Sequence, residues 1–338
     1  MDDLDRYSRQ RLLPEIGEEG QHRLSASRAA IVGCGALGTV QASLLVRAGI
    51  GETVLVDRDF VETSNLQRQC LFEERDAQAA TPKAVAAARS LRRANSRVQV
   101  TAVVKDLVAS NAESLLAGAD VILDGTDNYE TRYLINDVAV KRSIPWIYGA
   151  AVGTKGSLMP ILPGRTACLA CLFDDMPVER QPTCDTAGVL NAVTSLVGSL
   201  QAAEALKILA GRAESVLASF VSQDLWTGER SSLRTQTPNP ECRTCADRRF
   251  AHLDARVRST ARLCGRDAVQ VPGGDRPVRL AELAASLQRV GKVRATEHVV
   301  RFWCPPHELM VFADGRTIVK GTHDVGLARS LRTRYVGA

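Results

Sequence analysis

The sequence predicts an α/β fold: a mostly parallel sheet with an antiparallel extension, followed by a small α+β domain. Over the first 145 residues, short aliphatic runs alternate with longer helical runs, an order typical of a parallel sheet covered by helices. From 146 to 233 the strand-like runs are shorter and favour antiparallel pairing. A further group of strands and helices begins near residue 256. We therefore expect one domain over 1–250 and a second over 256–338, large enough for its own core.

The expected elements of the first domain follow from local patterns. A stretch with polar faces at 5–24 is expected to be helical. Gly49 and Gly51 stop the helix at 36–48, and Pro82 stands at the first position of the next helix, where its missing N–H is harmless. The other expected elements are helices at 81–94, 111–116, 129–142 and 188–210, and strands at 28–33, 53–56, 97–104, 120–124, 146–150, 156–162, 216–221 and 227–233.

The second domain is expected to contain strands at 268–271, 297–303, 309–312 and 317–320 and helices at 280–290 and 323–335. Asp314 and Gly315 form a typical hairpin-turn pair. Residues 248–338 hold 17 Lys and Arg against 8 Asp and Glu, a net charge of +9, whereas the first 247 residues carry −4. Such a basic surface is either solvated without a special partner or docks an acidic protein or RNA.

Composition excludes several classes of protein. With 45% hydrophobic and 24% charged residues, the 338-residue chain is neither disordered nor fibrous. The most apolar stretch, 188–210, is interrupted by polar residues, and the first ten residues lack the apolar core of a secretory signal. We expect a cytoplasmic protein without a membrane span. Nine cysteines in a reducing compartment indicate metal ligation, catalysis or burial rather than disulfides.

The stretch IVGCGALG at 31–38 reads as a strand, a glycine turn and a helix start, the beginning of a Rossmann-like sheet. Gly33 permits the tight turn, Gly35 lets the backbone approach a phosphate, and Gly38 lets the helix pack closely. Asp57 ends the second strand, where a ribose hydroxyl would be bound. The pattern alone fits both NAD-dependent and ATP-dependent enzymes, because both place phosphate at a helix N-terminus.

A second group of residues favours ATP. Asn65 and Arg68 follow the acid-ended strand, Asp127 follows the strand at 120–124, and Lys83 begins a helix near the same rim. Two cations neutralise phosphoryl charge and a carboxylate holds magnesium, whereas dinucleotide redox chemistry requires none of them. Each residue by itself could equally be a surface charge.

Two CxxC pairs give the strongest chemical signal. Cys168 and Cys171 form one pair, and Cys242 and Cys245 form the other, about 70 residues later. Four thiolates at this spacing suit a tetrahedral structural zinc site. A redox pair is the rival interpretation, but redox CxxC motifs usually come singly, at a helix start that follows a strand.

Cys184 differs from the other cysteines because it lies in a polar loop, QPTCDTAGV, just before a helix. A helix N-terminus lowers a thiol pKa, which indicates a reactive thiol, although an idle exposed cysteine would look the same. The remaining cysteines are interpreted as packing residues: Cys34, Cys70, Cys264 and Cys304.

With these motifs in place, 6–246 resembles the ThiF/MoeB family, bacterial relatives of the enzymes that activate ubiquitin-like proteins. The motifs that carry the resemblance are RYSRQ, GCGALG, SNLQRQ, TPK, DGTDN, both CxxC pairs and TCDTAGV, in family order. The resemblance implies ATP as ligand. It implies as substrate a small ubiquitin-like sulfur carrier protein, of the ThiS or MoaD kind, whose terminal Gly-Gly carboxylate is adenylated for thiamine or molybdopterin biosynthesis.

The resemblance also assigns roles in nucleotide binding. It implies that Asp57 holds the ribose, that Asn65, Arg68 and Lys83 contact the phosphates, and that the backbone of Ala36 passes beside them.

Other roles concern the metals, the partner and the thiol. The resemblance implies that Asp127 holds Mg²⁺ with Asn128 beside it, and that the CxxC pairs hold Zn²⁺. It implies a homodimer in which Arg9 reaches the neighbouring subunit's site, and a reactive thiol at Cys184 in some members.

The C-terminal domain departs from the family's common forms. Chains of the MoeB kind that add a domain often add a rhodanese, whose persulfide-forming loop is not found here. We therefore expect 256–338 to dock a partner, either the carrier or a sulfur donor protein. Two alternatives stay open at this point: an NAD-dependent oxidoreductase, and a non-catalytic module that binds nucleotide or RNA, although nucleic acid is the less favoured partner.

Overall fold

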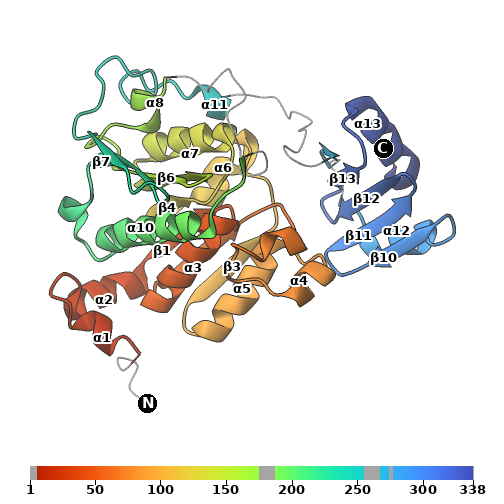
Figure 1. Cartoon of the computed structure of the whole chain (residues 1–338), viewed down its shortest axis with the longest axis horizontal. Helices are drawn as coiled ribbons and strands as arrows, with labels where there is room; N and C mark the ends of the chain where they lie inside the picture. The colour runs from red at the N-terminus through yellow and green to blue at the C-terminus, as the bar shows by residue number, and fades with distance from the viewer. Residues whose placement is uncertain (1–5, 175–186, 255–266, 274–276, 338) are drawn as a thin grey trace. The chain divides into compact units, whose positions relative to one another are not determined.

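The chain divides into two compact units, Met1–Arg256 and Val257–Ala338, both drawn in Figure 1. The computed structural model describes residues 6–174, 187–254, 267–273 and 277–337. Each unit is built around its own sheet.

An eight-stranded sheet in the order β3-β2-β1-β4-β5-β6-β7-β8 forms the centre of the first unit. The strands from β3 to β5 are parallel, and the pairs from β5 to β8 are antiparallel. This confirms the predicted parallel sheet with an antiparallel extension. The strands are β1 Arg28–Val32, β2 Glu52–Val56, β3 Gln99–Val103, β4 Val121–Asp124, β5 Trp146–Val152, β6 Lys155–Ile161, β7 Ser219–Asp224 and β8 Arg230–Arg234.

Helices cover both faces of this sheet (Figure 1). Successive side chains of one strand point to opposite faces of the sheet. Ile31 therefore packs on the face covered by α3, α5 and α10, whereas Ala30 and Val32 pack on the face covered by α6 and α7. The strands therefore read as continuous aliphatic runs in the sequence. The helices are α1 Ser8–Arg11, α2 Gly17–Ala26, α3 Ala36–Ala48, α4 Glu74–Gln78, α5 Lys83–Ala94, α6 Ala109–Leu116, α7 Tyr129–Arg142, α8 Leu169–Leu172, α10 Asn191–Leu209 and α11 Ala251–Asp254, with short 3₁₀ turns η1 Thr63–Asn65 and η2 Ala213–Ser215.

Two local expectations were wrong. The stretch at 5–24 is not one helix but α1 and α2, because Pro14 and Gly17, with φ of 59°, interrupt it. Pro82 is not the first helical residue: it is extended, with φ −55° and ψ 135°, and precedes α5 as its cap. Its carbonyl accepts the first helical hydrogen bond, from Ala86 N at 2.9 Å.

Helix α10 is the only helix among the described residues with the length and composition of a membrane span, and half of its apolar window is buried inside the protein. Its buried side packs on α3 and on strands β4 to β6. This is the behaviour of a core helix.

The second unit has a five-stranded antiparallel sheet in the order β10-β11-β12-β13-β9, packed against two helices. The predicted hairpin turn at Asp314 and Gly315 lies between β12 and β13. Strand β10 was missed because it is an exposed edge strand with little apolar signal. The elements are β9 Ala268–Val271, α12 Leu280–Leu287, β10 Lys292–Ala295, β11 Val299–Cys304, β12 His307–Phe312, β13 Thr317–Lys320 and α13 Val325–Val336.

Candidate functional site

The glycine turn joins β1 to α3 and tolerates no side chain at two of its positions. Gly33 has φ of 90°, and a Cβ there would lie 2.6 Å from the Gly125 carbonyl oxygen. A Cβ on Gly38 would lie only 1.9 Å from the Gly33 carbonyl oxygen. Gly35 is open by comparison, with nothing closer than 3.8 Å to such a Cβ. Helix α3 then begins at Ala36 without a side-chain cap, which leaves its first N–H groups suited to an anion.

Asp57 fastens the end of β2 to this turn. Its Oδ2 accepts a hydrogen bond from Cys34 N at 2.6 Å, and its Oδ1 accepts one from Asp59 N at 2.6 Å. Burial raises the pKa of the Asp57 carboxyl, and the nearby Lys83 ammonium opposes that shift. The residue expected to hold a ribose is therefore also part of the frame of the glycine turn.

Asn65 is the last residue of η1, and Arg68 lies on the loop that follows it. The buried Asn65 accepts a hydrogen bond at Oδ1 from Glu62 N at 3.0 Å, which fixes the start of the loop. Arg68 is half-buried and donates through Nη1 to the Ser64 carbonyl at 3.0 Å. The next residue, Gln69, brings its Nε2 within 3.9 Å of the Cβ position of Gly35, so this loop adjoins the glycine turn.

Lys83 is the first residue of α5 and is buried, with Nζ 3.4 Å from Asp59 Oδ2. Its own backbone N donates to the Asp59 carbonyl at 2.8 Å. Asp59 was not among the residues predicted from the sequence, although a second carboxylate two residues after Asp57 was a signal that could have identified it.

Asp127 and Asn128 lie in the loop after β4. Asn128 begins α7, and its Oδ1 accepts a hydrogen bond from Thr131 N at 2.9 Å. Asp127 is exposed, and its carboxylate accepts no hydrogen bond from any residue that the structure describes. The loop touches the glycine turn, because a Cβ on Gly125 would lie 2.4 Å from the Gly33 carbonyl oxygen.

Arg9 lies away from this group. It is exposed on α1, and the neighbouring Gln10 donates to the carbonyl of Ala48, the last residue of α3, at 3.0 Å. The glycine turn is at the opposite end of that 13-residue helix, roughly 18 Å away at the usual rise per residue. The chain's own fold therefore does not bring Arg9 to the glycine turn.

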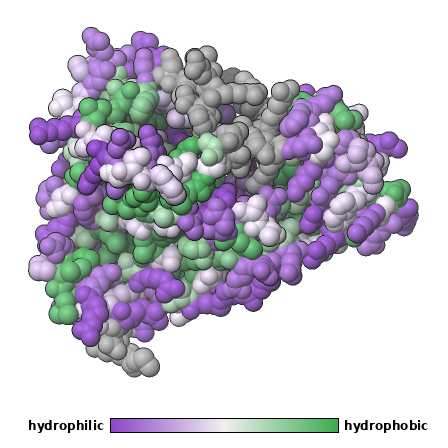
Figure 2. Space-filling model, in the orientation of Figure 1, coloured by the Kyte–Doolittle hydropathy of each residue, from purple (hydrophilic) through white to green (hydrophobic). Residues whose placement is uncertain are grey.

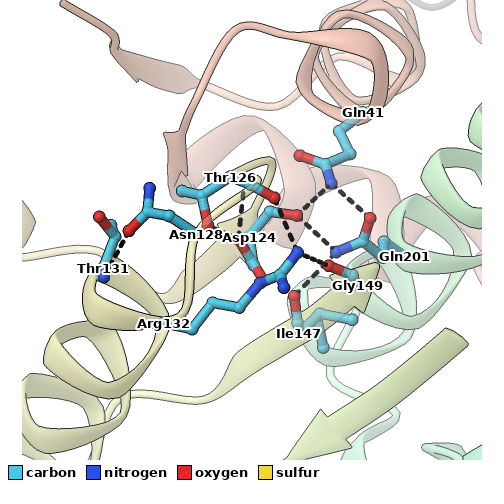
Figure 3. Close-up of polar contacts among 9 residues, drawn as sticks. All are labelled: Gln41, Asp124, Thr126, Asn128, Thr131, Arg132, Ile147, Gly149 and Gln201. Atoms are coloured by element: carbon cyan, nitrogen blue, oxygen red, sulfur yellow. Dashed lines mark hydrogen bonds and ion pairs between the residues drawn. The ribbon is translucent and has the colours of Figure 1, made fainter. Parts of the chain in front are cut away.

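A buried ion pair supports the loop that carries Asp127 (Figure 3). Arg132 Nε lies 3.0 Å from Asp124 Oδ2, and both side chains are almost fully buried. Burial raises the pKa of the Asp124 carboxyl while Arg132 opposes the rise. Burial would lower the pKa of Arg132, but Asp124 together with Tyr148, Asp127 and Tyr129 outweighs that effect, so the net shift is upward. From the sequence, Asp124 was predicted only as the end of a strand and Arg132 only as part of a helix.

The four cysteines of the CxxC pairs come together beside α8, which Cys168 precedes and which contains Cys171. Their Sγ atoms all lie within 4.8 Å of one another. The Sγ–Sγ distances are 3.8 Å from Cys168 to Cys171, 3.6 Å from Cys168 to Cys242 and 3.4 Å from Cys171 to Cys245. Sulfurs bound to one tetrahedral zinc lie about 3.8 Å apart, given bonds of ~2.3 Å. This donor set therefore fits zinc.

The thiols of that cluster perturb one another. The hydrogen bond between Cys171 and Cys168 lowers the pKa of Cys171 to about 5. Burial is the largest cause that raises the pKa of Cys245 to about 12, and the neighbouring thiols add to it. Four negative sulfurs this close would repel one another, and a divalent cation would offset that repulsion.

The other cysteines have different outcomes. Cys34 is buried in the core and Cys304 is half-buried against the core of the second unit. The expectation that Cys70 packs inside was wrong, because it is exposed: the apolar neighbour that turns inward is Phe72. Cys184 and Cys264 lie outside the described residues.

Comparisons with known proteins agree with this geometry. The model of the ThiF family matches residues 7–244. A Bacillus subtilis protein named sulfur carrier protein ThiS adenylyltransferase is 42% identical over 337 residues, 98% of this chain and 99% of its own length. A Thermus thermophilus sulfur carrier protein adenylyltransferase is 38% identical, over 73% of this chain and 92% of its own. Mouse adenylyltransferase and sulfurtransferase MOCS3 is 42% identical over 245 residues. The match covers 72% of this chain and 53% of the mouse protein.

Among solved structures, Escherichia coli MccB aligns with a TM-score of 0.63 at 22% identity, over 72% of each chain. At this identity the likeness shows the fold. The family match and the near full-length relative show more: the chain belongs to the ThiF family.

Proposed function

We propose that the chain adenylates the C-terminal glycine carboxylate of a ubiquitin-like sulfur carrier protein, with release of pyrophosphate. The observation that carries the proposal is the 42% identity to a ThiS adenylyltransferase over 98% of the chain, which includes both units. The activated carrier would then accept sulfur for thiamine or molybdopterin biosynthesis. An NAD-dependent oxidoreductase would leave the cysteine cluster and the Lys83–Asp59 pair without a role.

The proposed ATP site is the rim formed by the glycine turn and its neighbours. The uncapped start of α3 at Ala36 binds phosphate through backbone N–H groups, and Asp57 faces the ribose. Asn65, Arg68 and Lys83 approach the phosphates from the neighbouring loop and from α5.

The reaction is a displacement at phosphorus. A carboxylate oxygen of the carrier bonds to the α-phosphorus of ATP, and the bond from that phosphorus to the bridging oxygen breaks. The product is the carrier's acyl-adenylate, and the electron pair leaves on pyrophosphate. Because negative charge builds on the phosphate oxygens, Arg68 and Lys83 stabilise the transition state. Loss of one such donor costs about 2.7–4 kcal/mol in comparable sites.

Asp127 fits a magnesium ligand. Its carboxylate is exposed, accepts no hydrogen bond from a described residue, and lies in a loop that touches the glycine turn. Hard carboxylate oxygens beside substrate phosphates are the usual setting for Mg²⁺. Bound there, the ion would supply additional charge neutralisation. Asn128 holds the loop by capping α7.

The cysteine cluster is proposed to hold a structural Zn²⁺. Cys168, Cys171, Cys242 and Cys245 supply four sulfurs and leave no open position, so the metal would connect distant segments without catalysis.

A homodimer would complete the site. Arg9 is exposed, and α1 is anchored at the far end of α3 from its own glycine turn, so it is available to a neighbouring copy. Leu44 on α3 and Leu200 on α10 are each 37% exposed, and Figure 2 shows hydrophobic residues on the visible surface of the α3 and α10 region. Such a surface suits a symmetric interface.

Three further assignments extend the proposal. Cys184 would act as the reactive thiol that receives the activated tail. The second unit would dock the carrier or a sulfur donor protein, in keeping with its predicted role. The protein would work in the cytoplasm, in keeping with the expectation from its sequence.

ATP–pyrophosphate exchange tests the proposal. The purified protein, Mg²⁺, ATP and labelled pyrophosphate are combined with a sulfur carrier, and with the same carrier lacking its last glycine as control. Exchange that requires the intact carrier supports the proposal. Absence of exchange with ThiS-like and MoaD-like carriers alike would reject it.

A further inference from the structure

We infer that Arg132 and Asp124 are positioning residues for the proposed reaction: their buried ion pair fixes the loop of Asp127 against the glycine turn. The inference rests on the proposed function, because that function gives Asp127 its metal and the turn its phosphates. Neither member of the pair needs to contact a substrate for this role.

Arg132 acts on the loop through Thr126, the residue just before Asp127. Arg132 Nη2 donates to the Thr126 carbonyl at 2.8 Å. On the other side, Thr126 N and Oγ1 both donate to Asp124 Oδ1, at 2.8 and 2.7 Å. Asp124 and Arg132 therefore bind both hydrogen-bond donors and the carbonyl of Thr126 (Figure 3). Thr126 immediately precedes Asp127, so it sets where the Asp127 backbone starts.

The same pair is anchored to the sheet. Arg132 Nη2 also donates to the Gly149 carbonyl on β5 at 3.1 Å. The guanidinium carbon lies 5.2 Å from the ring centre of Tyr148 and 5.5 Å from that of Tyr129, so aromatic faces limit its movement. The cation is thus fixed from the strand, the loop and its own helix.

Two glutamines brace the Asp124 backbone from the opposite side of the sheet. Gln41 Nε2 on α3 and Gln201 Nε2 on α10 both donate to the Asp124 carbonyl, at 2.9 and 2.8 Å. Gln201 also donates to the Ile147 carbonyl on β5 at 2.9 Å. Since α3 is the helix that follows the glycine turn, this bracing ties the end of β4 to the element that carries the phosphate site.

The loop and the turn are in direct backbone contact. Gly125 follows Asp124, and its N donates to the Val32 carbonyl at the end of β1 at 2.8 Å. Only 2.4 Å would separate a Cβ at Gly125 from the Gly33 carbonyl. A small rotation of the loop would therefore move the Asp127 carboxylate relative to the turn. Rigidity at Asp124 and Arg132 is what prevents that rotation.

Stability by itself does not account for the pair. Replacing a buried ion pair with apolar groups of similar volume is often neutral or stabilising, whereas removing one partner leaves an uncompensated charge. The extra bonds from Arg132 to Thr126 and Gly149 are directional, and an apolar pair would not reproduce them. A variant that keeps the fold but lacks these bonds separates positioning from stability.

The test compares Arg132→Lys and the neutral double variant Asp124→Asn/Arg132→Met with the wild type. Arg142→Met is the matched control, since Arg142 lies on the same helix but pairs with Glu113 at the surface and is 58% exposed. Each protein is assayed at a temperature below the midpoint of its thermal unfolding. Two readouts are taken: the Mg²⁺ concentration for half-maximal ATP–pyrophosphate exchange, and hydrogen exchange of the peptide that spans 125–129 in the protein alone.

We expect both Arg132 variants to raise the half-maximal Mg²⁺ concentration about tenfold or more, as the loss of a residue that orients a metal ligand usually does. They should also accelerate hydrogen exchange at 125–129, while Arg142→Met changes neither readout. If a folded Arg132 variant kept the wild-type half-maximal Mg²⁺ concentration and the wild-type rate of hydrogen exchange at 125–129, the inference would be overturned. So would failure of both variants to fold, because the pair would then serve the fold itself. If the wild type lacks carrier-dependent exchange, the proposed function fails, and the hydrogen-exchange readout still tests the positioning of the loop.

Discussion

A methyl group added at Gly38 should disable the site while the sheet stays intact. Alanine normally stabilises a helix by about 1 kcal/mol relative to glycine. Here the new Cβ would lie 1.9 Å from the Gly33 carbonyl oxygen, and real Cβ contacts are essentially never under 3.0 Å, so the start of α3 or the turn must move by at least 1.1 Å. A misplacement of about 1 Å can reduce an enzyme rate roughly 10²-fold. We expect Gly38→Ala to lose about that much ATP–pyrophosphate exchange.

Gly20→Ala is the matched control, because Gly20 is also helical but its Cβ would meet only side-chain atoms, of Ile16 at 3.2 Å and of Ala210 at 3.4 Å. That variant should keep exchange within about twofold of wild type, since α2 lies outside the proposed ATP site. Thermal unfolding monitored by circular dichroism checks that both variants are folded during the assay. Wild-type exchange in folded Gly38→Ala would refute the assigned geometry of the turn.

Three further predictions concern the metals and the interface. Asp127→Ala should retain its unfolding midpoint, because the side chain is exposed, yet lose exchange by about 10²-fold or more; unchanged exchange would remove Asp127 from the metal site. Cys245→Ser should lower bound zinc, measured by elemental mass spectrometry, and lower the midpoint by roughly 5 °C or more; well under one zinc per wild-type chain would contradict the site itself. Leu200→Glu should shift light scattering toward a monomer and lower exchange with it, whereas a dimer of unchanged affinity would place the interface elsewhere.

The sequence was most informative where parallel strands end. Gly33 and Asp57 directly follow β1 and β2, and Asp124 is the last residue of β4. Because these strands are parallel neighbours, the loops that follow them meet at one rim of the sheet. Spacing alone likewise indicated the cysteine cluster, because two CxxC pairs are specific. The local strand pattern and these motifs were sufficient for the parallel sheet and its antiparallel extension.

The supporting contacts could not be predicted from the sequence. Gln41 and Gln201 are 160 residues apart and meet only because α3 and α10 pack on the same face. Arg132 is one of many arginines, and nothing local shows that its side chain turns into the core. Asp59 could have been predicted more easily, because it follows Asp57 by only two residues. Partners that meet through tertiary packing can be identified only once the structure shows which faces of the helices are buried.

The most direct test of the central claim is intact-protein mass spectrometry of the carrier after incubation with this protein, ATP and Mg²⁺. We predict an AMP adduct on the carrier that fragmentation places at its C-terminal glycine, and that is absent when ATP is omitted. A carrier that stays unmodified under conditions in which the protein is folded and contains its metals would contradict the proposal that this chain activates a carrier's last carboxylate.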